Sequence, residues 1–181
     1  MTLVPVIETE RLILRGIGPA DFEPFAAFMA TDGSHYIGGP SGPEEAWRRL
    51  AGYAGSWALR GYGKFAVEDK ASGKFAGLVG PWFPVGWPEP EIAWTMMPEF
   101  QGRGLAKEAA LAALRYAYAN LGWNTAVSCM DPENTPSIRL AESLGAICEG
   151  TTEIRPYGGA LLYRHLPPAE LLAKSRGRNA A

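Results

Sequence analysis

The sequence is poor in the residues that build disulfide frameworks and metal centres. It holds two cysteines, Cys129 and Cys148, and two histidines, His35 and His165, among 181 residues. Two cysteines are too few for a disulfide framework, and neither they nor the histidines have the spacing of a zinc site. We therefore predict two reduced, buried thiols and no bound metal.

Long apolar runs and an excess of basic charge are missing as well. No run approaches the roughly 18 apolar residues of a membrane span, and no basic segment followed by an apolar stretch opens the chain. A formal net charge of −2 argues against a nucleic-acid-binding surface, because few phosphates would be neutralised. The one basic cluster lies near the end, at Lys174, Arg176 and Arg178, and has the pattern of a solvated tail. We expect a cytoplasmic protein that binds neither nucleic acid nor membrane.

The composition, 47% apolar and 20% charged, is typical of one compact α/β domain. We assign residues 1–168 to this domain and 169–181 to a C-terminal tail; the oligomeric state stays open, and a homodimer is compatible with the sequence. Hydrophobic periodicity predicts four helices, which begin near residues 19, 43, 103 and 136. It also predicts seven strands, at residues 8–15, 65–67, 74–79, 91–97, 126–130, 147–154 and 160–165.

Two further segments are predicted to be loops. Residues 31–43 are rich in glycine and proline, and residues 81–90 contain four prolines beside Trp82, Phe83 and Trp87. The prolines exclude residues 81–90 from a central strand. Each loop has two interpretations: a packed connection, or a wall of a substrate pocket, since binding residues gather on loops.

The stretch Gln101-Gly102-Arg103-Gly104-Leu105-Ala106 joins an apolar strand to a long helix. The first turn of a helix has backbone N–H groups without partners and the positive end of the helix dipole, and phosphate satisfies both. Gly102 and Gly104 allow left-handed backbone angles and a close approach to a ligand. Arg103 and Lys107 can add charged hydrogen bonds. We therefore predict a phosphate site here.

Three motifs carry a family resemblance. Residues 9–15 (TERLILR), residues 101–106 and residues 134–145 occur in this order. Together they resemble the GNAT superfamily of acyl-CoA-dependent N-acyltransferases, with Gln101, Gly104 and Ala106 at the positions of its Gln/Arg-x-x-Gly-x-Gly/Ala motif. Within the superfamily, the sequence is most similar to the RimJ/RimL-type ribosomal-protein N-terminal acetyltransferases.

The resemblance implies the α/β GNAT fold, with a mixed sheet of about seven strands and four flanking helices. It also implies a bulge in the fourth strand and a splay between the fourth and fifth strands. Acetyl-CoA would bind in that splay. Its pyrophosphate would contact the loop residues Gln101, Gly102, Arg103, Gly104, Leu105, Ala106 and Lys107. Its pantetheine arm would contact Trp94, Thr95, Met96, Met97, Asn134 and Ser137, with an N–H near Met96 facing the thioester carbonyl.

Acyl transfer to an amine requires a base, a proton donor for the thiolate and a stabiliser of the oxyanion. Glu91 matches the catalytic glutamate of several family members; the alternative is a solvated carboxylate at a strand end. Many GNAT enzymes have a tyrosine acid where this chain has Ala141. Ser137 matches the serine proposed as the acid in RimJ/RimL-type members; the alternative is a helix cap. A protein α-amine, with an unperturbed pKa of about 7.7–8.0, would need no strong base.

These residues together predict an N-acetyltransferase. It would transfer acetyl from acetyl-CoA to a primary amine by direct attack in a ternary complex, because Cys129 has no histidine near it in sequence and is no convincing nucleophile. The acceptor stays open between a protein N-terminus and a small molecule such as an aminoglycoside or an amino acid. The alternative is a non-catalytic acyl-CoA-binding sensor or interaction module on the same fold, which the missing tyrosine favours.

Overall fold

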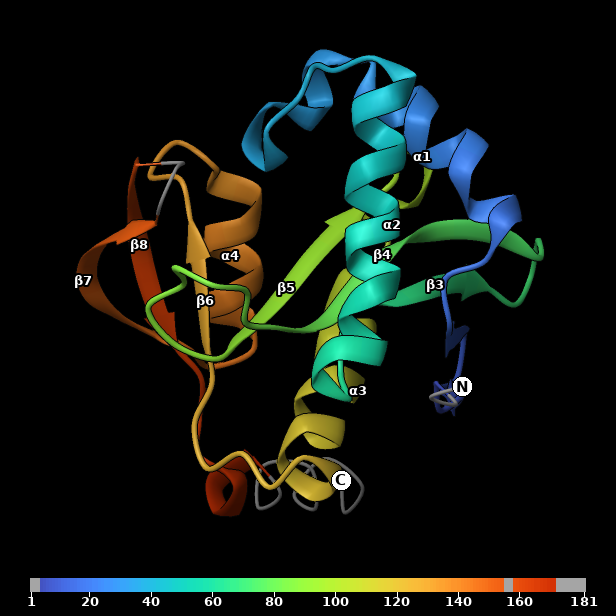
Figure 1. Cartoon of the computed structure of the whole chain (residues 1–181). Helices are drawn as coiled ribbons and strands as arrows, with labels where there is room; N and C mark the ends of the chain where they lie inside the picture. The colour runs from blue at the N-terminus through green and yellow to red at the C-terminus, as the bar shows by residue number, and fades with distance from the viewer. Residues whose placement is uncertain (1–3, 155–157, 172–181) are drawn as a thin grey trace.

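The computed structural model describes residues 4–154 and 158–171, and within these residues eight strands form one mixed sheet (Figure 1). The strand order across the sheet is β1-β2-β3-β4-β5-β6-β8-β7. The strands are β1 Ile7–Glu8, β2 Leu12–Arg15, β3 Phe65–Asp69, β4 Lys74–Trp82, β5 Glu91–Met96, β6 Val127–Met130, β7 Ile147–Ile154 and β8 Gly158–Arg164. The α-helices are α1 Phe22–Met29, α2 Pro43–Arg60, α3 Leu105–Asn120 and α4 Thr135–Ser143. The 3₁₀ helices are η1 Pro19–Asp21, η2 Asp32–Ile37 and η3 Pro98–Phe100.

The first predicted strand, residues 8–15, is wrong as a single element. It is a small hairpin in which β1 pairs antiparallel with β2, Ile7 opposite Leu14. The Thr9 N–H donates to the Leu12 carbonyl at 2.9 Å, and the Leu12 N–H donates to the Thr9 hydroxyl at 3.0 Å. A threonine that closes a tight turn in this way interrupts a strand, so the sheet has eight strands instead of seven.

The helix ends follow from local chemistry. Pro43 opens α2, where its missing N–H costs no hydrogen bond, and Gly61 ends the helix at φ +75°. The side chain of Asn134 caps α4 by accepting the Ser137 N–H at 3.3 Å. Helix α3 begins at Leu105, two residues later than predicted, because Gly104 is left-handed at φ +75°.

The prediction that residues 81–90 contain no strand is wrong at its first two residues. Pro81 and Trp82 end the central strand β4 and pair with Ile92 and Glu91 of β5. On its other side β4 pairs with β3 only as far as Val79, opposite Phe65. Pro81 therefore lies beyond the end of β3, where no ladder hydrogen bond requires its missing N–H.

The predicted splay is confirmed. Strands β5 and β6 are parallel neighbours that share one register pair, Glu91 with Val127, and they diverge beyond it (Figure 1). The prediction of a bulge in β5 is wrong, because the pairing of β5 with β4 continues without a register shift from Met96 to Glu91. One edge of β5 is thus left without a partner strand over most of its length.

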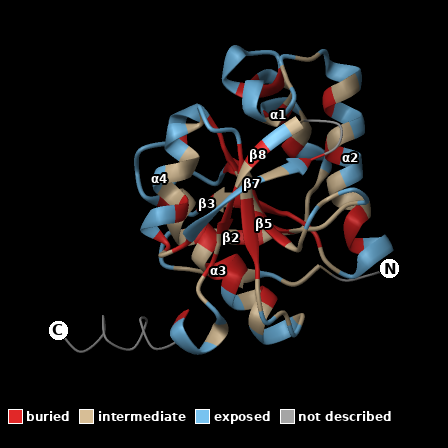
Figure 2. Ribbon diagram, turned by 90° about the vertical axis from the view of Figure 1, so that its left-hand side faces the viewer, coloured by how far each residue is buried: buried red, intermediate tan, exposed pale blue. Residues whose placement is uncertain are grey.

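The core lies between the sheet and its helices. In Figure 1, α2 lies in front of the sheet and α3 behind it, and in Figure 2 the buried colour follows β2, β3 and β5. The largest fully buried side chains include Phe25, Phe65, Met29 and Leu114. Together the two apolar layers exclude water from both faces of the central strands.

Two remaining predictions concern the thiols and the tail. Both cysteines are free, as predicted, but Cys148 is exposed on the edge strand β7 and Cys129 is only partly buried, so the predicted burial is wrong for Cys148 and incomplete for Cys129. Leu171, within the predicted tail, is buried against the core, and residues 172–181, with the basic cluster, lie outside the described residues. None of the helices in the described part of the chain is long and apolar enough to cross a membrane.

Candidate active site

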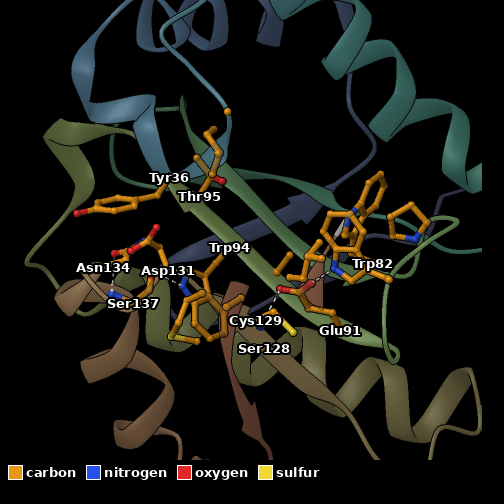
Figure 3. Close-up of a pocket in the computed structure, with 18 of the residues that line it drawn as sticks. Tyr36, Trp82, Glu91, Trp94, Thr95, Ser128, Cys129, Asp131, Asn134 and Ser137 are labelled. Atoms are coloured by element: carbon orange, nitrogen blue, oxygen red, sulfur yellow. Dashed lines mark hydrogen bonds between the residues drawn. The ribbon is translucent and has the colours of Figure 1, made fainter. Parts of the chain in front are cut away.

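A cavity of about 600 Å³ opens where β5 and β6 diverge. Five of the predicted site residues line it: Glu91, Trp94, Thr95, Asn134 and Ser137 (Figure 3). Trp94 lies between the two ends of the cavity, with Ser137, Asn134 and Asp131 at one end and Glu91 and Trp82 at the other. The structure therefore brings both predicted catalytic side chains into one cavity. Met96, Met97 and residues 101–107 lie outside its lining, toward and beyond the C-terminal end of β5.

Glu91 is a buried carboxyl, 5% exposed, and not the solvated strand-end residue of the alternative interpretation. It accepts hydrogen bonds from the indole N–H of Trp87 and, at 3.2 Å, from the backbone N–H of Cys129. Burial raises the pKa of Glu91 above its ordinary value, while these hydrogen bonds and the charge of Lys64 act in the opposite direction. A buried carboxyl with a raised pKa in a cavity has the properties of a general base.

Ser137 lies in the first turn of α4, half-buried beside Trp94. Its hydroxyl oxygen accepts a hydrogen bond from Trp94 Nε1 at 3.2 Å, so its own proton is free to be donated elsewhere. The side-chain oxygen of Asn134 holds the Ser137 N–H, and this leaves the Asn134 amide NH₂ for another acceptor. Ser137 is therefore both part of a capped helix turn and a hydroxyl donor facing the cavity.

The free edge of β5 follows from the alternation of backbone groups along a strand. The Met97 N–H donates to Ala76 of β4 at 2.9 Å, so the odd-numbered residues face β4. The even-numbered residues face β6, where the Ile92 carbonyl accepts the Ser128 hydroxyl at 2.6 Å. The backbone N–H groups of Trp94 and Met96 consequently point into the splay.

The glycine-rich loop has the predicted backbone geometry. Gly102 and Gly104 are left-handed, at φ +70° and +75°, and a β-carbon at Gly102 would meet nothing within 4 Å. The loop ends at the first turn of α3, and buried Leu105 anchors that turn in the core. Gln101 turns back and donates its Nε2 hydrogen to the Met96 carbonyl at 2.9 Å. The loop is thereby fixed to the end of β5.

A hydrogen-bond network joins the opening motif to this loop. Glu108, in the first turn of α3, accepts the Thr9 hydroxyl at 2.6 Å and the Arg11 N–H at 2.8 Å, and it pairs with Arg11 Nε at 2.7 Å. Arg11 also donates to the Arg103 carbonyl at 3.0 Å. Burial by itself would raise the pKa of Glu108, but the hydrogen bonds from Thr9 and Arg11 outweigh it and lower that pKa. The first and second motifs of the sequence thus form one structural unit.

The two predicted loops, residues 31–43 and 81–90, both contribute to the cavity wall. His35, Tyr36 and Ile37 of η2 line it, and the Tyr36 hydroxyl donates to the Glu133 carbonyl at 3.3 Å. Of residues 81–90, Trp82, Pro84, Val85 and Trp87 line it. Glu89 forms a bidentate ion pair with Arg164, whose two terminal nitrogens lie 2.7 and 2.8 Å from the carboxylate oxygens. Both loops therefore act as pocket walls as well as connections.

Sequence reasoning missed three side chains near the cavity. Lys64, directly before β3, lines it and is 6% exposed. His165 is 3% exposed, its Nε2 lies 2.8 Å from the Ser128 hydroxyl oxygen, and burial lowers its pKa to about 4. Because Ser128 donates its proton to Ile92, His165 must be the donor in this pair. The one available signal was a lysine directly before the apolar run Phe65-Ala66-Val67.

Cys129 lines the same cavity, but its environment does not make it a nucleophile. Burial, together with the negative charges of Glu91 and Glu89, raises the pKa of the Cys129 thiol. A thiol must ionise to attack a thioester. This environment agrees with direct attack by the amine in place of a covalent cysteine intermediate.

Comparison with known protein families identifies the class. Residues 11–147 match the model of the Acetyltransferase (GNAT) domain, so the chain belongs to this family. The acetyltransferase from Agrobacterium tumefaciens str. C58 has a similar structure, with a TM-score of 0.82 and 31% identity over 90% of this chain and 94% of that chain. The family consists of acyltransferases whose general activity is transfer of an acetyl group from acetyl-CoA to an amine.

Two further proteins are similar to the chain in sequence or in fold. The uncharacterized N-acetyltransferase YnaD of Bacillus subtilis is 37% identical over 60 residues, which cover 33% of this chain and 35% of YnaD. The chain therefore spans about a third of the length of that relative. The ribosomal-protein-S5-alanine acetyltransferase of Vibrio fischeri shares the fold, with a TM-score of 0.69 and 20% identity over 91% of this chain and 97% of that one. The predicted likeness to ribosomal-protein acetyltransferases is thus confirmed for the fold.

Proposed function

We propose that this protein is an N-acetyltransferase in which acetyl-CoA and a primary amine meet in the cavity between β5 and β6. One observation carries the proposal: Glu91 and Ser137 lie at opposite ends of a single cavity, on either side of Trp94 (Figure 3). A base for the amine and an acid for the thiolate are needed on the two sides of a reacting thioester. This arrangement supplies them.

The coenzyme would bind along the free edge of β5. Its pyrophosphate would accept hydrogen bonds from the N–H groups of the loop around Gly102 and Gly104, with charge from Arg103 and Lys107. Its pantetheine amides would pair with Trp94 and Met96, whose N–H groups face the splay. Thr95 and Met97 present their backbone groups to β4, so their contacts with the coenzyme would come from other atoms. The Asn134 amide NH₂ is left to donate to the pantetheine arm.

The chemical step would then proceed by direct attack. Glu91 accepts the proton of the amine, directly or through a water molecule, and the neutral nitrogen attacks the thioester carbonyl. The Met96 N–H donates to the oxygen, which becomes negatively charged in the tetrahedral intermediate. The C–S bond breaks, the Ser137 hydroxyl gives its proton to the leaving thiolate, and the extra proton on the attacking nitrogen passes back to the Ser137 oxygen, which leaves a neutral amide and a free thiol. The hydrogen bond from Trp94 to Ser137 makes that hydroxyl a better donor.

The direct test is release of free CoA from acetyl-CoA in the presence of N-terminal peptides, polyamines, aminoglycosides and amino acids. We expect amine-dependent release, and we expect Ser137→Ala and Glu91→Gln each to lower the rate by about 10²- to 10⁴-fold. Ser143→Ala is a matched control for Ser137, because Ser143 lies exposed at the end of the same helix. Glu99→Gln is the control for Glu91, because Glu99 is exposed outside the cavity.

The alternative, a non-catalytic acyl-CoA-binding module, is favoured by Ala141, which is fully buried at the position where many family members carry a tyrosine acid. Such a protein would bind acetyl-CoA and gain thermal stability, yet release no CoA with any amine. If acetyl-CoA binds but no amine of the panel causes release of CoA, catalysis is overturned and this alternative remains.

A further inference from the structure

Lys64 is a buried cation at one end of the cavity. Its Nζ lies 4.2 Å from the ring centre of Tyr53 and 5.2 Å from that of Trp82, and the residue is 6% exposed. Trp82 and Glu91 lie at the same end of the cavity, away from Ser137 (Figure 3). This lysine is therefore held where the proposed acceptor amine, and not the coenzyme, would enter.

The backbone of Lys64 is fixed by close packing. Its carbonyl accepts the indole N–H of Trp57 at 3.0 Å. On the neighbouring strand stands Gly80, where a β-carbon would lie 3.0 Å from the Lys64 Cα and 2.8 Å from the Gly63 carbonyl oxygen. Glycine at position 80 therefore allows the backbone at Gly63 and Lys64 to pack closely against β4, and the Trp57 hydrogen bond holds it there.

Lys64 forms no direct ion pair within the described part of the chain. The lysines that form ion pairs there are Lys70 and Lys74. Glu91 attracts Lys64 through space, but its carboxyl oxygens are held by Trp87 and by the Cys129 N–H. Aromatic faces compensate only part of the cost of burying an ammonium group, and an anion compensates more.

Arg49 and Asp131, two other charged residues of the cavity wall, have partners, although the buried Nε of Arg49 makes no hydrogen bond. Arg49 pairs with Glu45 at 3.2 Å and donates to the Ile37 carbonyl at 2.8 Å. Asp131, at the Ser137 end, accepts the Glu133 N–H at 2.7 Å. Among the described residues, Lys64 is thus the cavity cation that forms no direct ion pair and can offer its charge to an incoming ligand.

We propose that Lys64 binds a carboxylate on the acceptor, so that the protein acetylates small amino acids in preference to polyamines and aminoglycosides. The inference rests on the proposed function and names the acceptor class. An α-amino acid carries an amine for Glu91 and a carboxylate for Lys64, two groups that lie at the same end of the cavity. One point charge among aromatic rings suits a singly charged carboxylate, whereas a phosphate dianion favours several donors or an arginine fork.

The kinetic test compares each amino acid with its own carboxamide. We expect the native protein to favour the acid, and we expect Lys64→Met to lower kcat/KM for the acid by about 10- to 100-fold with little change for the carboxamide. Lys74→Met is the matched control, because Lys74 is exposed and pairs only with Glu99. Equal rates for acid and carboxamide with the native protein would overturn the inference, while release with any amine would still support acetyl transfer.

A binding test separates this inference from catalysis. Calorimetry in the presence of CoA would compare N-acetyl amino acids with N-acetyl amino acid amides, which need no turnover to bind. We expect the acids to bind about tenfold or more tightly to the native protein, and this preference to vanish in both Lys64→Met and Lys64→Gln. If neither compound binds, or if the preference survives in both variants, Lys64 is not the carboxylate site.

Discussion

Glu91 illustrates how one residue acquires its chemistry from its surroundings. It opens β5, and in isolation it would be an ordinary carboxylate at a strand end. The ends of β4 and β6 lie on either side of Glu91 and exclude water from its carboxyl group. The Trp87 indole and the Cys129 N–H donate hydrogen bonds to the carboxyl in place of water. Burial dominates and raises its pKa. The residue is therefore a stronger base than a surface glutamate.

The pH dependence of activity should report this environment. Because Glu91 must be ionised to accept a proton, we expect kcat/KM to fall at low pH with a midpoint above the ordinary glutamate pKa of 4.5. A pH–rate profile of the native protein and of Glu91→Gln checks this. In Glu91→Gln, the fall of kcat/KM at low pH that comes from protonation of Glu91 should disappear. The dependence at higher pH, which comes from deprotonation of the amine substrate, should remain. An unchanged fall at low pH in Glu91→Gln would assign that fall to another group.

His165 is another residue with a strongly altered pKa, about 4 in the folded protein against 6.5 for an unperturbed histidine. Between these values the unfolded chain binds a proton that the folded protein does not. Stability therefore rises with pH across this window and falls as the pH drops below 6.5.

We expect this effect to be measurable by urea unfolding. The histidine term should lower the unfolding free energy of the native protein by about 2 kcal/mol between pH 7.5 and pH 5. His165→Gln, which can still donate to Ser128 but does not titrate, should lack this loss. His35→Gln is the control, because His35 is exposed. The same loss in His165→Gln as in the native protein would contradict the assignment.

At the scale of elements, the unit of interest is the turn from β5 into α3. Local sequence dictates its backbone, because Gly102 and Gly104 adopt angles that side chains disfavour. Its orientation comes from elsewhere in the chain. Arg11 holds the Arg103 carbonyl, and Gln101 holds the Met96 carbonyl. The loop is therefore held ready for a ligand before any ligand binds.

Two matched substitutions separate backbone strain from ligand binding. Gly104→Val and Gly73→Val both place a side chain at a left-handed glycine, at φ +75° and +67°. We expect each to lower stability by about 1–3 kcal/mol. Only Gly104→Val should weaken acetyl-CoA binding, by about tenfold or more, because only that glycine lies in the proposed phosphate loop. Calorimetry compares the affinity of the two variants for acetyl-CoA. If Gly104→Val folds and binds acetyl-CoA as tightly as the native protein, the phosphate-loop proposal is wrong.

At the scale of the whole molecule, the sheet consists of two parts joined at a single register pair. Strands β1–β5 form one part and β6–β8 the other, with Glu91 and Val127 between them. An open parallel edge inside a sheet is costly unless something satisfies its backbone groups. The proposed coenzyme would do so along the length of the splay.

Hydrogen exchange tests this view of the splay. We expect acetyl-CoA to slow exchange of the Trp94 and Met96 amides, which face the splay, more than that of Thr95, which faces β4. At about 100 times its dissociation constant, acetyl-CoA should stabilise the fold by about 2.7 kcal/mol. NMR-detected exchange with and without acetyl-CoA measures both effects. Equal protection of all three amides would indicate general stabilisation without pairing along β5.

Most of the fold could be predicted from the sequence because its signals are local. Pro43 and Gly61 mark the two ends of α2, and Asn134 marks the start of α4. The errors arose where a distant partner decides. Pro81 is tolerated in a central strand because β3 stops short of it, and Cys148 is exposed because β7 is an edge strand. Neither fact is visible in the local sequence.

For the candidate site, the sequence by itself determined the glycine turn, the capped turn that carries Ser137 and the carboxyl at position 91. These depend on backbone angles and neighbouring side chains, which act over a few residues. Only the tertiary structure decided that Glu91, Trp82 and Lys64 share one end of a cavity. Burial and through-space charge depend on which strands become neighbours, and that is set by packing across the whole sheet.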